Sequence, residues 1–415
     1  KNNYPGLHIV EGSTRSDAVE EECRAGHQQM AKFMTILYLF LTSSMAASIP
    51  VVHAERNPPG IFVFGDSLSD VGNNNNMLDA FKANFPHYGV DFPGHRPTGR
   101  FTNGYNFIDM IAQLVGFSIS PQAYASIGRA MEVLRGVNFA SGGSGIAVKC
   151  VVDNVIKCIT MEEQILNFRR TRVLLQPLLH NRVTHFISKS IFIITCGSND
   201  LNGFFNDNFL NPTPPIDEYV SNLTSKFRDQ LQELYNLGGR KFLIINVPAI
   251  GMIPTARALE PLKSLGLDFP KLLNGYAQMF NAAEETMLKE LSSALPEMKY
   301  SIGNSYRAVL DVIEHPEEHG IKNVTSPCCG EVRFVTAVPP VEVIHCAPDA
   351  WLCSNRSEFV FWDNIHPTQG VIDYASNLFY SGGRDYAEPI NVKQLVEMGS
   401  SGWGVPGNRG GVEAM

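Results

Sequence analysis

The residue types that acyl transfer requires occur at two distant places in the chain. Ser67 follows a short apolar run, residues 61–64, and a glycine-led turn, which would expose its hydroxyl as a nucleophile. Asp363 and His366 are three residues apart and precede Pro367, whose ring disfavours a helical conformation at the histidine. A loop here can bring the carboxylate to Nδ1 and leave Nε2 to take the serine proton. The three residues predict a Ser-His-Asp triad.

Two further loops contain candidate donors for the oxyanion that acyl transfer generates. Gly143 has no side chain to block a close approach of its N–H, Asn199 offers a neutral amide, and the backbone N–H of Ser67 is a third donor. Each feature also has a plain structural explanation. A serine after a strand is often a turn residue or helix cap, the glycines can form a tight turn, and Asn199 can cap a loop. The agreement of several loops therefore carries more weight than any one of them.

The elements that must position these residues follow from apolar runs and helical periodicity. Strands are expected at residues 61–64, 137–140, 191–195, 242–246 and, more weakly, 299–302, and helices at 216–237 and 272–291. Continuous apolar strands indicate a sheet that is covered on both faces. Their alternation with helices predicts a mostly parallel sheet, whose carboxyl edge would collect the loops of Ser67, Gly143 and Asn199.

Four segments resemble sequence blocks of the GDSL esterase/lipase family, which is part of the SGNH hydrolase superfamily. The similarity is close to the plant-type secreted branch, and the blocks follow the family's order. They are FGDSLSDVGNN at 64–74, GVNFASGGSGI at 136–146, GSND at 197–200 and FWDNIHPT at 361–368. One departure is Met252, where many relatives carry cysteine, so their disulfide pattern does not transfer directly.

The resemblance implies a role for each candidate residue. Ser67 would be the nucleophile, His366 the base and Asp363 its partner, and Ser67, Gly143 and Asn199 would form the oxyanion hole. Of the two adjacent glycines, the matching block favours Gly143. The resemblance also implies an α/β fold of three layers, α/β/α and flavodoxin-like, with a mostly parallel five-stranded sheet.

Composition limits the partners that the chain can take. It has 415 residues, of which 44% are hydrophobic, and a net charge of −8 without the basic cluster of a nucleic-acid-binding face. His315 and His319 match an inverted zinc-protease pattern, but Pro316 disturbs the required helix and no third ligand is evident. We expect a small-molecule or lipid ester as substrate, no nucleic acid, no metal and no cofactor. The oligomeric state stays open.

The eight cysteines suggest local disulfides in an oxidising compartment. Cys150 and Cys158 flank a short loop. Cys328, Cys329, Cys346 and Cys353 lie in one stretch and allow three pairings, between which the sequence does not choose. Cys196 ends an apolar run and is expected to be a buried free thiol.

The N-terminal region has the features of a secretory signal peptide. From Met30, a lysine is followed by an apolar stretch and small residues up to Ala54, and the stretch is too short for a membrane span of about 20 residues. A retained anchor is the alternative. Sequons at Asn222, Asn323 and Asn355 agree with secretion. We expect an upstream extension outside the native protein at 1–29, the signal peptide at 30–54, one hydrolase domain at 55–398 and a flexible glycine-rich tail at 399–415.

These observations predict a secreted serine esterase or lipase that hydrolyses esters of lipids or acylated carbohydrates through an acyl-enzyme. An acyltransferase that uses the same acyl-enzyme is one alternative, and a non-catalytic binding protein on this fold is another. Because a histidine must be neutral to act as base, activity is expected to rise with pH through about 6–7.

Overall fold

A computed structural model describes residues 58–152, 155–208, 213–336 and 340–398. The chain divides into two units, Lys1–Ala54 and Glu55–Met415, and every described residue belongs to the second. The predicted upstream extension, signal peptide and tail lie outside the described residues. None of the described helices is long and apolar enough to cross a membrane.

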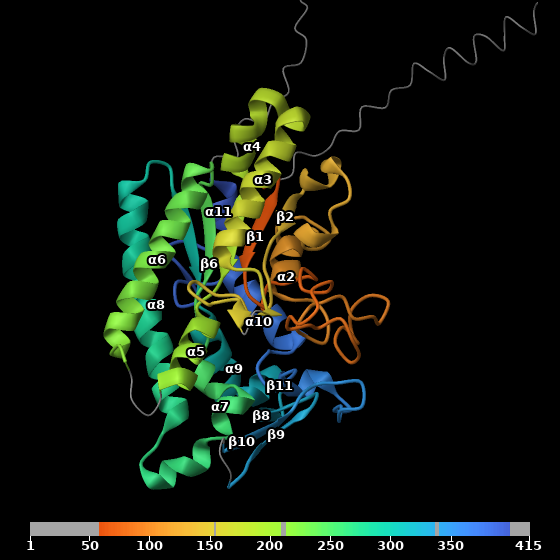
Figure 1. The fold of residues 1–415 in the computed structure, drawn as a ribbon, viewed down its shortest axis with the longest axis vertical. Coiled ribbons are helices and arrows are strands. Elements are labelled where there is room, and N and C mark those ends of the chain that lie inside the picture. The colour runs from red at the N-terminus through yellow and green to blue at the C-terminus, as the bar shows by residue number, and fades with distance from the viewer. Residues whose placement is uncertain (1–57, 153–154, 209–212, 337–339, 399–415) are drawn as a thin grey trace, which may run out of the picture. The chain divides into compact units, whose positions relative to one another are not determined.

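A six-stranded sheet forms the centre of the described part (Figure 1). Its order is β12-β7-β6-β5-β1-β2, and all neighbours are parallel except β12, which is antiparallel to β7. All five predicted strands are present. The sixth, β12, has only two residues and carries no sequence signal of its own. The strands are β1 (Ile61–Gly65), β2 (Gly136–Asn138), β5 (Ile191–Thr195), β6 (Lys241–Ile245), β7 (Lys299–Gly303) and β12 (Ala387–Glu388).

Helices cover both faces of this sheet and complete the predicted three layers (Figure 1). The two helices predicted from periodicity are α6 and α8. The helices are α2 (Phe107–Leu114), α3 (Met161–Leu179), α4 (Val183–Lys189), α5 (Ser198–Asn208), α6 (Ile216–Asn236), α7 (Pro254–Arg257), α8 (Phe269–Ala294), α9 (Ser305–Glu314), α10 (Gln369–Ser381) and α11 (Val392–Glu397).

Side chains alternate along β1, so this strand contributes residues to a hydrophobic core on each face of the sheet. Phe62 and Phe64 point to one face, where the ring of Phe168 in α3 packs edge-on against both. Ile61 and Val63 point to the opposite face, which α2, α10 and α11 cover. Both faces are therefore apolar, which explains why the strands are continuous hydrophobic runs.

A disulfide-linked region follows α9. It contains two small sheets, β8 (Asn323–Pro327) with β11 (Phe359–Phe361) and β9 (Glu331–Phe334) with β10 (Val341–Ile344). Cys328 pairs with Cys353 and Cys329 with Cys346, which resolves the three alternatives.

The other three cysteines among the described residues also agree with prediction. A disulfide joins Cys150 and Cys158 and closes the hairpin of β3 (Val151–Val152) and β4 (Val155–Ile156). Cys196 is a buried free thiol. Burial and the nearby Glu284, Asp200 and Asp66 raise the pKa of this thiol well above its ordinary value.

Glu284 of α8 places a carboxyl group in the core. The side chain is buried, and neither oxygen has a hydrogen-bond partner within the described residues. Burial raises its pKa from 4.5 to about 8. Between these two values the folded chain binds a proton that the unfolded chain has lost, so this group makes the protein less stable as pH rises.

Replacing Glu284 by glutamine is expected to remove that pH dependence. The stability of Glu284→Gln relative to the wild type should increase from pH 5 to pH 8, by at most about 1.4 kcal/mol per pH unit. Urea unfolding at pH 5, 6, 7 and 8 measures the slope. The neighbouring Glu285 is exposed, so Glu285→Gln is the matched control and should keep the wild-type slope. Equal slopes in all three proteins would contradict the assignment.

Candidate active site

The structure brings Ser67, His366 and Asp363 together in a hydrogen-bonded row. His366 Nε2 lies 2.8 Å from Ser67 Oγ, and Nδ1 lies 2.8 Å from Asp363 Oδ2. Ser67 reaches this position because the chain turns sharply at Gly65, the last residue of β1. Gly65 has φ +130°, and a Cβ there would stand 2.0 Å from the carbonyl oxygen of Thr195 in β5. Only glycine fits at this turn.

The carboxylate of Asp363 is buried and receives several donors. Oδ1 accepts the backbone N–H groups of Ile365 at 2.8 Å and His366 at 2.7 Å. Oδ2 accepts the hydroxyl of Tyr88 at 2.7 Å in addition to His366 Nδ1. Burial by itself raises the pKa of Asp363, but the His366 charge and the hydrogen bonds from His366 and Ile365 lower it below the ordinary value. The group is therefore held as an anion beside the imidazole.

Backbone hydrogen bonds hold the loop of Asp363 and His366 against the disulfide-linked region. The N–H of Trp362 donates to the carbonyl of His366, which closes the loop on itself. The N–H groups of Cys328 and Cys329 donate to the carbonyls of Phe361 and Trp362. Since each of these cysteines is in a different disulfide, two covalent cross-links support the strand that leads into the site.

The two adjacent glycines of the second loop differ in their hydrogen bonding. The N–H of Gly142 donates to Asp70 Oδ2 at 2.9 Å, so this donor is already engaged. Gly143 has φ +86°, and a Cβ there would stand 2.6 Å from the ring of Phe81. Asn199 lies in the first turn of α5, and its amide donates to the carbonyl of Ser144 at 2.8 Å. An amide nitrogen has two hydrogens, so one more donor position belongs to this side chain.

Buried polar side chains tie these loops to the nucleophile loop. Asp70 accepts the N–H groups of Gly72 and Asn73 as well as that of Gly142. Asn73 donates to the carbonyls of Asn138 and Ala140, at the end of β2. Asp70 and Asn73 stand in the first GDSL-like block. Only their place in that block marked them as candidates, since their residue types and spacing alone predict turns.

A second set of buried groups supports the same loops from the helix side. Gln164 of α3 pairs with the backbone of Gly65 through both its amide oxygen and nitrogen, at 2.8 and 2.9 Å. Asp200 accepts the N–H groups of Ile146 and Ala147. Burial raises the pKa of Asp200 to about 6, although these N–H groups oppose the rise. The loop geometry therefore depends on groups outside the predicted set.

Asp66, directly before the serine, is a further titratable group at the site. It is buried, and its Oδ1 accepts the N–H of Leu68 at 3.0 Å. Burial raises its pKa to about 7, while that hydrogen bond and the charge of His366 oppose the rise. It can therefore change charge in the pH range where a histidine base operates.

The other predicted sites lie elsewhere. Among the sequons, Asn222 and Asn355 are exposed and Asn323 is partly buried. His319 lies in a 3₁₀ turn, where its ring packs edge-on against Tyr374. Within the described residues, no group of three or more His, Cys, Asp or Glu side chains is arranged to hold a metal ion.

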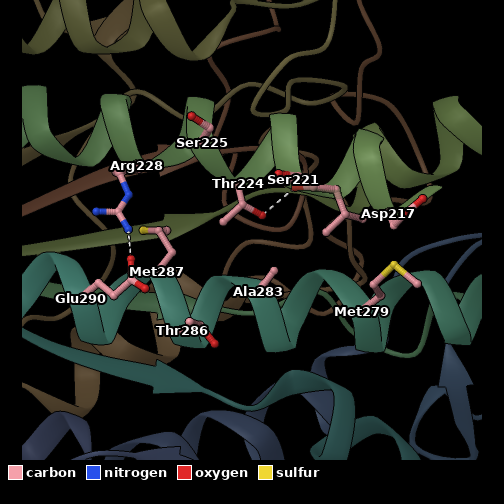
Figure 2. Close-up of a pocket in the computed structure, with 11 residues that line it drawn as sticks. Asp217, Ser221, Thr224, Ser225, Arg228, Met279, Ala283, Thr286, Met287 and Glu290 are labelled. Carbon is pink, nitrogen blue, oxygen red and sulfur yellow. Dashed lines mark hydrogen bonds and ion pairs between the residues drawn. The ribbon is translucent and has the colours of Figure 1, made fainter. Parts of the chain in front are cut away.

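A surface groove of about 490 Å³ runs between α6 and α8, and none of the predicted site residues lines it. Figure 2 shows Ser221 and Thr224 on one helix facing Met279 and Met287 on the other, with an ion pair between Arg228 and Glu290. This hollow is therefore separate from the Ser67 site.

Comparison with known proteins agrees with the sequence blocks. The family described as GDSL-like Lipase/Acylhydrolase matches residues 61–371. The chain is 34% identical to GDSL esterase/lipase At5g55050 of Arabidopsis thaliana over 88% of this chain and 98% of that protein. It is 34% identical to GDSL esterase/lipase At4g16230 of the same plant over 87% of this chain and 98% of that protein. A third Arabidopsis protein, GDSL esterase/lipase At1g71691, is 35% identical over 82% of this chain and 86% of that protein. With this match across most of its length, the chain belongs to the GDSL-like lipase/acylhydrolase family of carboxylic ester hydrolases.

Proposed function

We propose that this protein is a secreted serine esterase that cleaves carboxylic esters through an acyl-enzyme on Ser67. The observation that carries the proposal is the unbroken row from Ser67 Oγ to His366 Nε2, and from Nδ1 to the Asp363 carboxylate, at 2.8 Å for each step. A neutral imidazole in this position accepts the serine proton at one nitrogen while the carboxylate fixes the tautomer at the other.

The reaction follows from these contacts. His366 takes the hydroxyl proton as Ser67 Oγ forms a bond to the ester carbonyl carbon, and the carbonyl oxygen becomes an oxyanion. When the tetrahedral species collapses, the ester C–O bond breaks and His366 gives its proton to the departing alcohol. Water then attacks the acyl-enzyme with His366 again as base, releasing the acid and restoring Ser67.

Gly143, Asn199 and the Ser67 N–H are the proposed oxyanion donors. The bond from the Gly142 N–H to Asp70 supports Gly143 as the donor of the pair, because the amide of Gly142 is already engaged. The positive φ of Gly143 and the close ring of Phe81 further disfavour any side chain at that position.

Secretion and the substrate class rest on other features. Three disulfides are typical of an oxidising compartment. Two large apolar side chains are exposed beside the proposed catalytic residues: Phe81, at 59%, packs against Gly143, and Ile365, at 45%, adjoins His366. Exposed apolar side chains of this size favour an ester with an apolar acyl or alcohol group.

Replacing the nucleophile tests the mechanism. Ser67→Ala should lower kcat/KM for p-nitrophenyl butyrate by about 10⁴-fold or more, because the proposed acyl-enzyme forms on the Ser67 hydroxyl. Ser221→Ala, in the groove between α6 and α8, is the matched serine control and should keep wild-type activity. A folded Ser67→Ala protein that hydrolyses the ester as fast as the wild type would overturn the proposal. Chromatography of the products with an added alcohol distinguishes hydrolysis from transfer.

Phe81 is expected to influence the preference for acyl length. Because p-nitrophenyl esters vary only in the acyl chain, Phe81→Ala should reduce the ratio of kcat/KM for butyrate over acetate by about 3- to 10-fold, as apolar contact is lost. Leu78 is 92% exposed in the same loop, and Leu78→Ala should leave the ratio unchanged. An equal loss with both esters in Phe81→Ala would show that the ring does not contact the acyl chain.

A further inference from the structure

The segment between β1 and α2 packs against the proposed catalytic pair, and its Tyr88 and Phe101 belong to the same buried cluster as the cysteines of the two C-terminal disulfides. The Tyr88 hydroxyl donates to Asp363 Oδ2 at 2.7 Å, and the centroids of the Phe101 ring and the His366 imidazole are 5.0 Å apart. We propose that Tyr88 is a positioning residue, whose hydroxyl fixes the Asp363 carboxylate against His366 and draws off part of its negative charge. This inference rests on the triad proposed above.

The Tyr88 ring is buried among other aromatic rings, which hold it beside Asp363. The side chain is 7% exposed, and its ring packs edge-on against Phe85, Phe101 and Trp362, with centroids 5.3, 6.1 and 6.1 Å away. Trp362 immediately precedes Asp363, so the ring and the carboxylate are positioned by the same short stretch of chain. A hydroxyl held this way is preorganised for one acceptor.

Among the described residues, Tyr88 is also the one donor to Asp363 that comes from outside the carboxylate's own loop. Oδ1 is bonded by Ile365 and His366 backbone groups, whereas Oδ2 is shared between His366 Nδ1 and the tyrosine. Without the hydroxyl, one lone pair of Oδ2 would face buried aromatic rings, and the carboxylate could turn about its Cβ–Cγ bond. A buried acceptor that loses its partner is destabilised.

The tyrosine stays a donor throughout the working pH range. Burial and the Asp363 charge raise its pKa well above the ordinary value, so the hydroxyl keeps its proton. Asp66, from the nucleophile loop, is another titratable group near His366, and the His366 charge lowers the pKa of Asp66. Because Asp66 is unchanged when Tyr88 is replaced, a comparison of variants isolates the tyrosine.

Two kinetic consequences follow for Tyr88→Phe, which keeps the ring. First, kcat should fall by about 10-fold, the size expected for losing one hydrogen bond to a charged group, while KM stays within about twofold because Tyr88 does not face the substrate. Second, without the Tyr88 hydrogen bond the Asp363 carboxylate should carry more of its negative charge toward His366, which favours the imidazolium form before substrate binds. The pH of half-maximal kcat/KM on the acid side should therefore move upward by about 0.3 to 1 unit.

The experiment measures pH profiles of p-nitrophenyl butyrate hydrolysis for the wild type, Tyr88→Phe and Tyr105→Phe. Tyr105 is a partly buried tyrosine whose ring packs against Phe92, and its variant should match the wild type. Thermal melting reports separately on packing. An acid limb in Tyr88→Phe that does not move, or moves downward, would overturn the inference, whatever the change in melting temperature.

A double-mutant cycle with Asp363→Ala tests whether Tyr88 acts through the carboxylate. In the Asp363→Ala background, Tyr88→Phe should change the residual kcat by less than about twofold; an unchanged 10-fold effect would contradict the inference. If Tyr88→Phe does not fold, 3-fluorotyrosine at position 88 keeps the ring and the hydroxyl but donates more strongly. The acid limb should then move downward, and no shift would refute the role.

Failure of this inference can be told apart from failure of the triad proposal. Suppose that the wild type hydrolyses the ester, Ser67→Ala abolishes this activity, and Tyr88→Phe has the same kinetics and pH profile as the wild type. This result refutes only the role of the tyrosine. A wild type whose turnover survives Ser67→Ala refutes the triad and, with it, the basis of this inference.

Discussion

The site depends on buried polar side chains that join loops from separate strand ends. Parallel strands bring loops to one edge of a sheet, but do not fix how those loops lie against each other. Here Asp70 binds its own turn and the N–H of Gly142, and Asn73 reaches two carbonyls at the end of β2. Because unpaired polar groups are costly in a buried position, the loops have few other arrangements in which every partner is satisfied.

Around Asp363 the support is covalent and aromatic. Two disulfides lie behind the strand that leads to Asp363, and Tyr88 with Trp362 fills the space beside it. The carboxylate is thus bonded from its own loop and from a segment 275 positions away in the sequence. A rigid surrounding of this kind keeps a short row of hydrogen bonds in one geometry without relying on the substrate to order it.

The sequence predicted the layers of this fold because apolar runs and helical spacing are local signals. It missed β12, whose two residues are too few to show a pattern, and it left the pairing of Cys328 and Cys329 open. It marked Ser67, Gly143, Asn199, Asp363 and His366 by type and block. It gave no sign of the Tyr88 contact, because that bond depends on the path of a loop, which no periodicity describes.

The order of the proposed triad along the chain has a consequence during translation. Ser67 follows the first strand, whereas its partner His366 lies 299 residues later, after the disulfide-linked region. A ribosome therefore completes the nucleophile loop long before the base exists, and an unfinished chain holds an ordinary, unreactive serine. With the proposed triad, activity requires that the last portion has been translated and has docked onto the first, so we expect shortened chains that lack the C-terminal portion to be inactive.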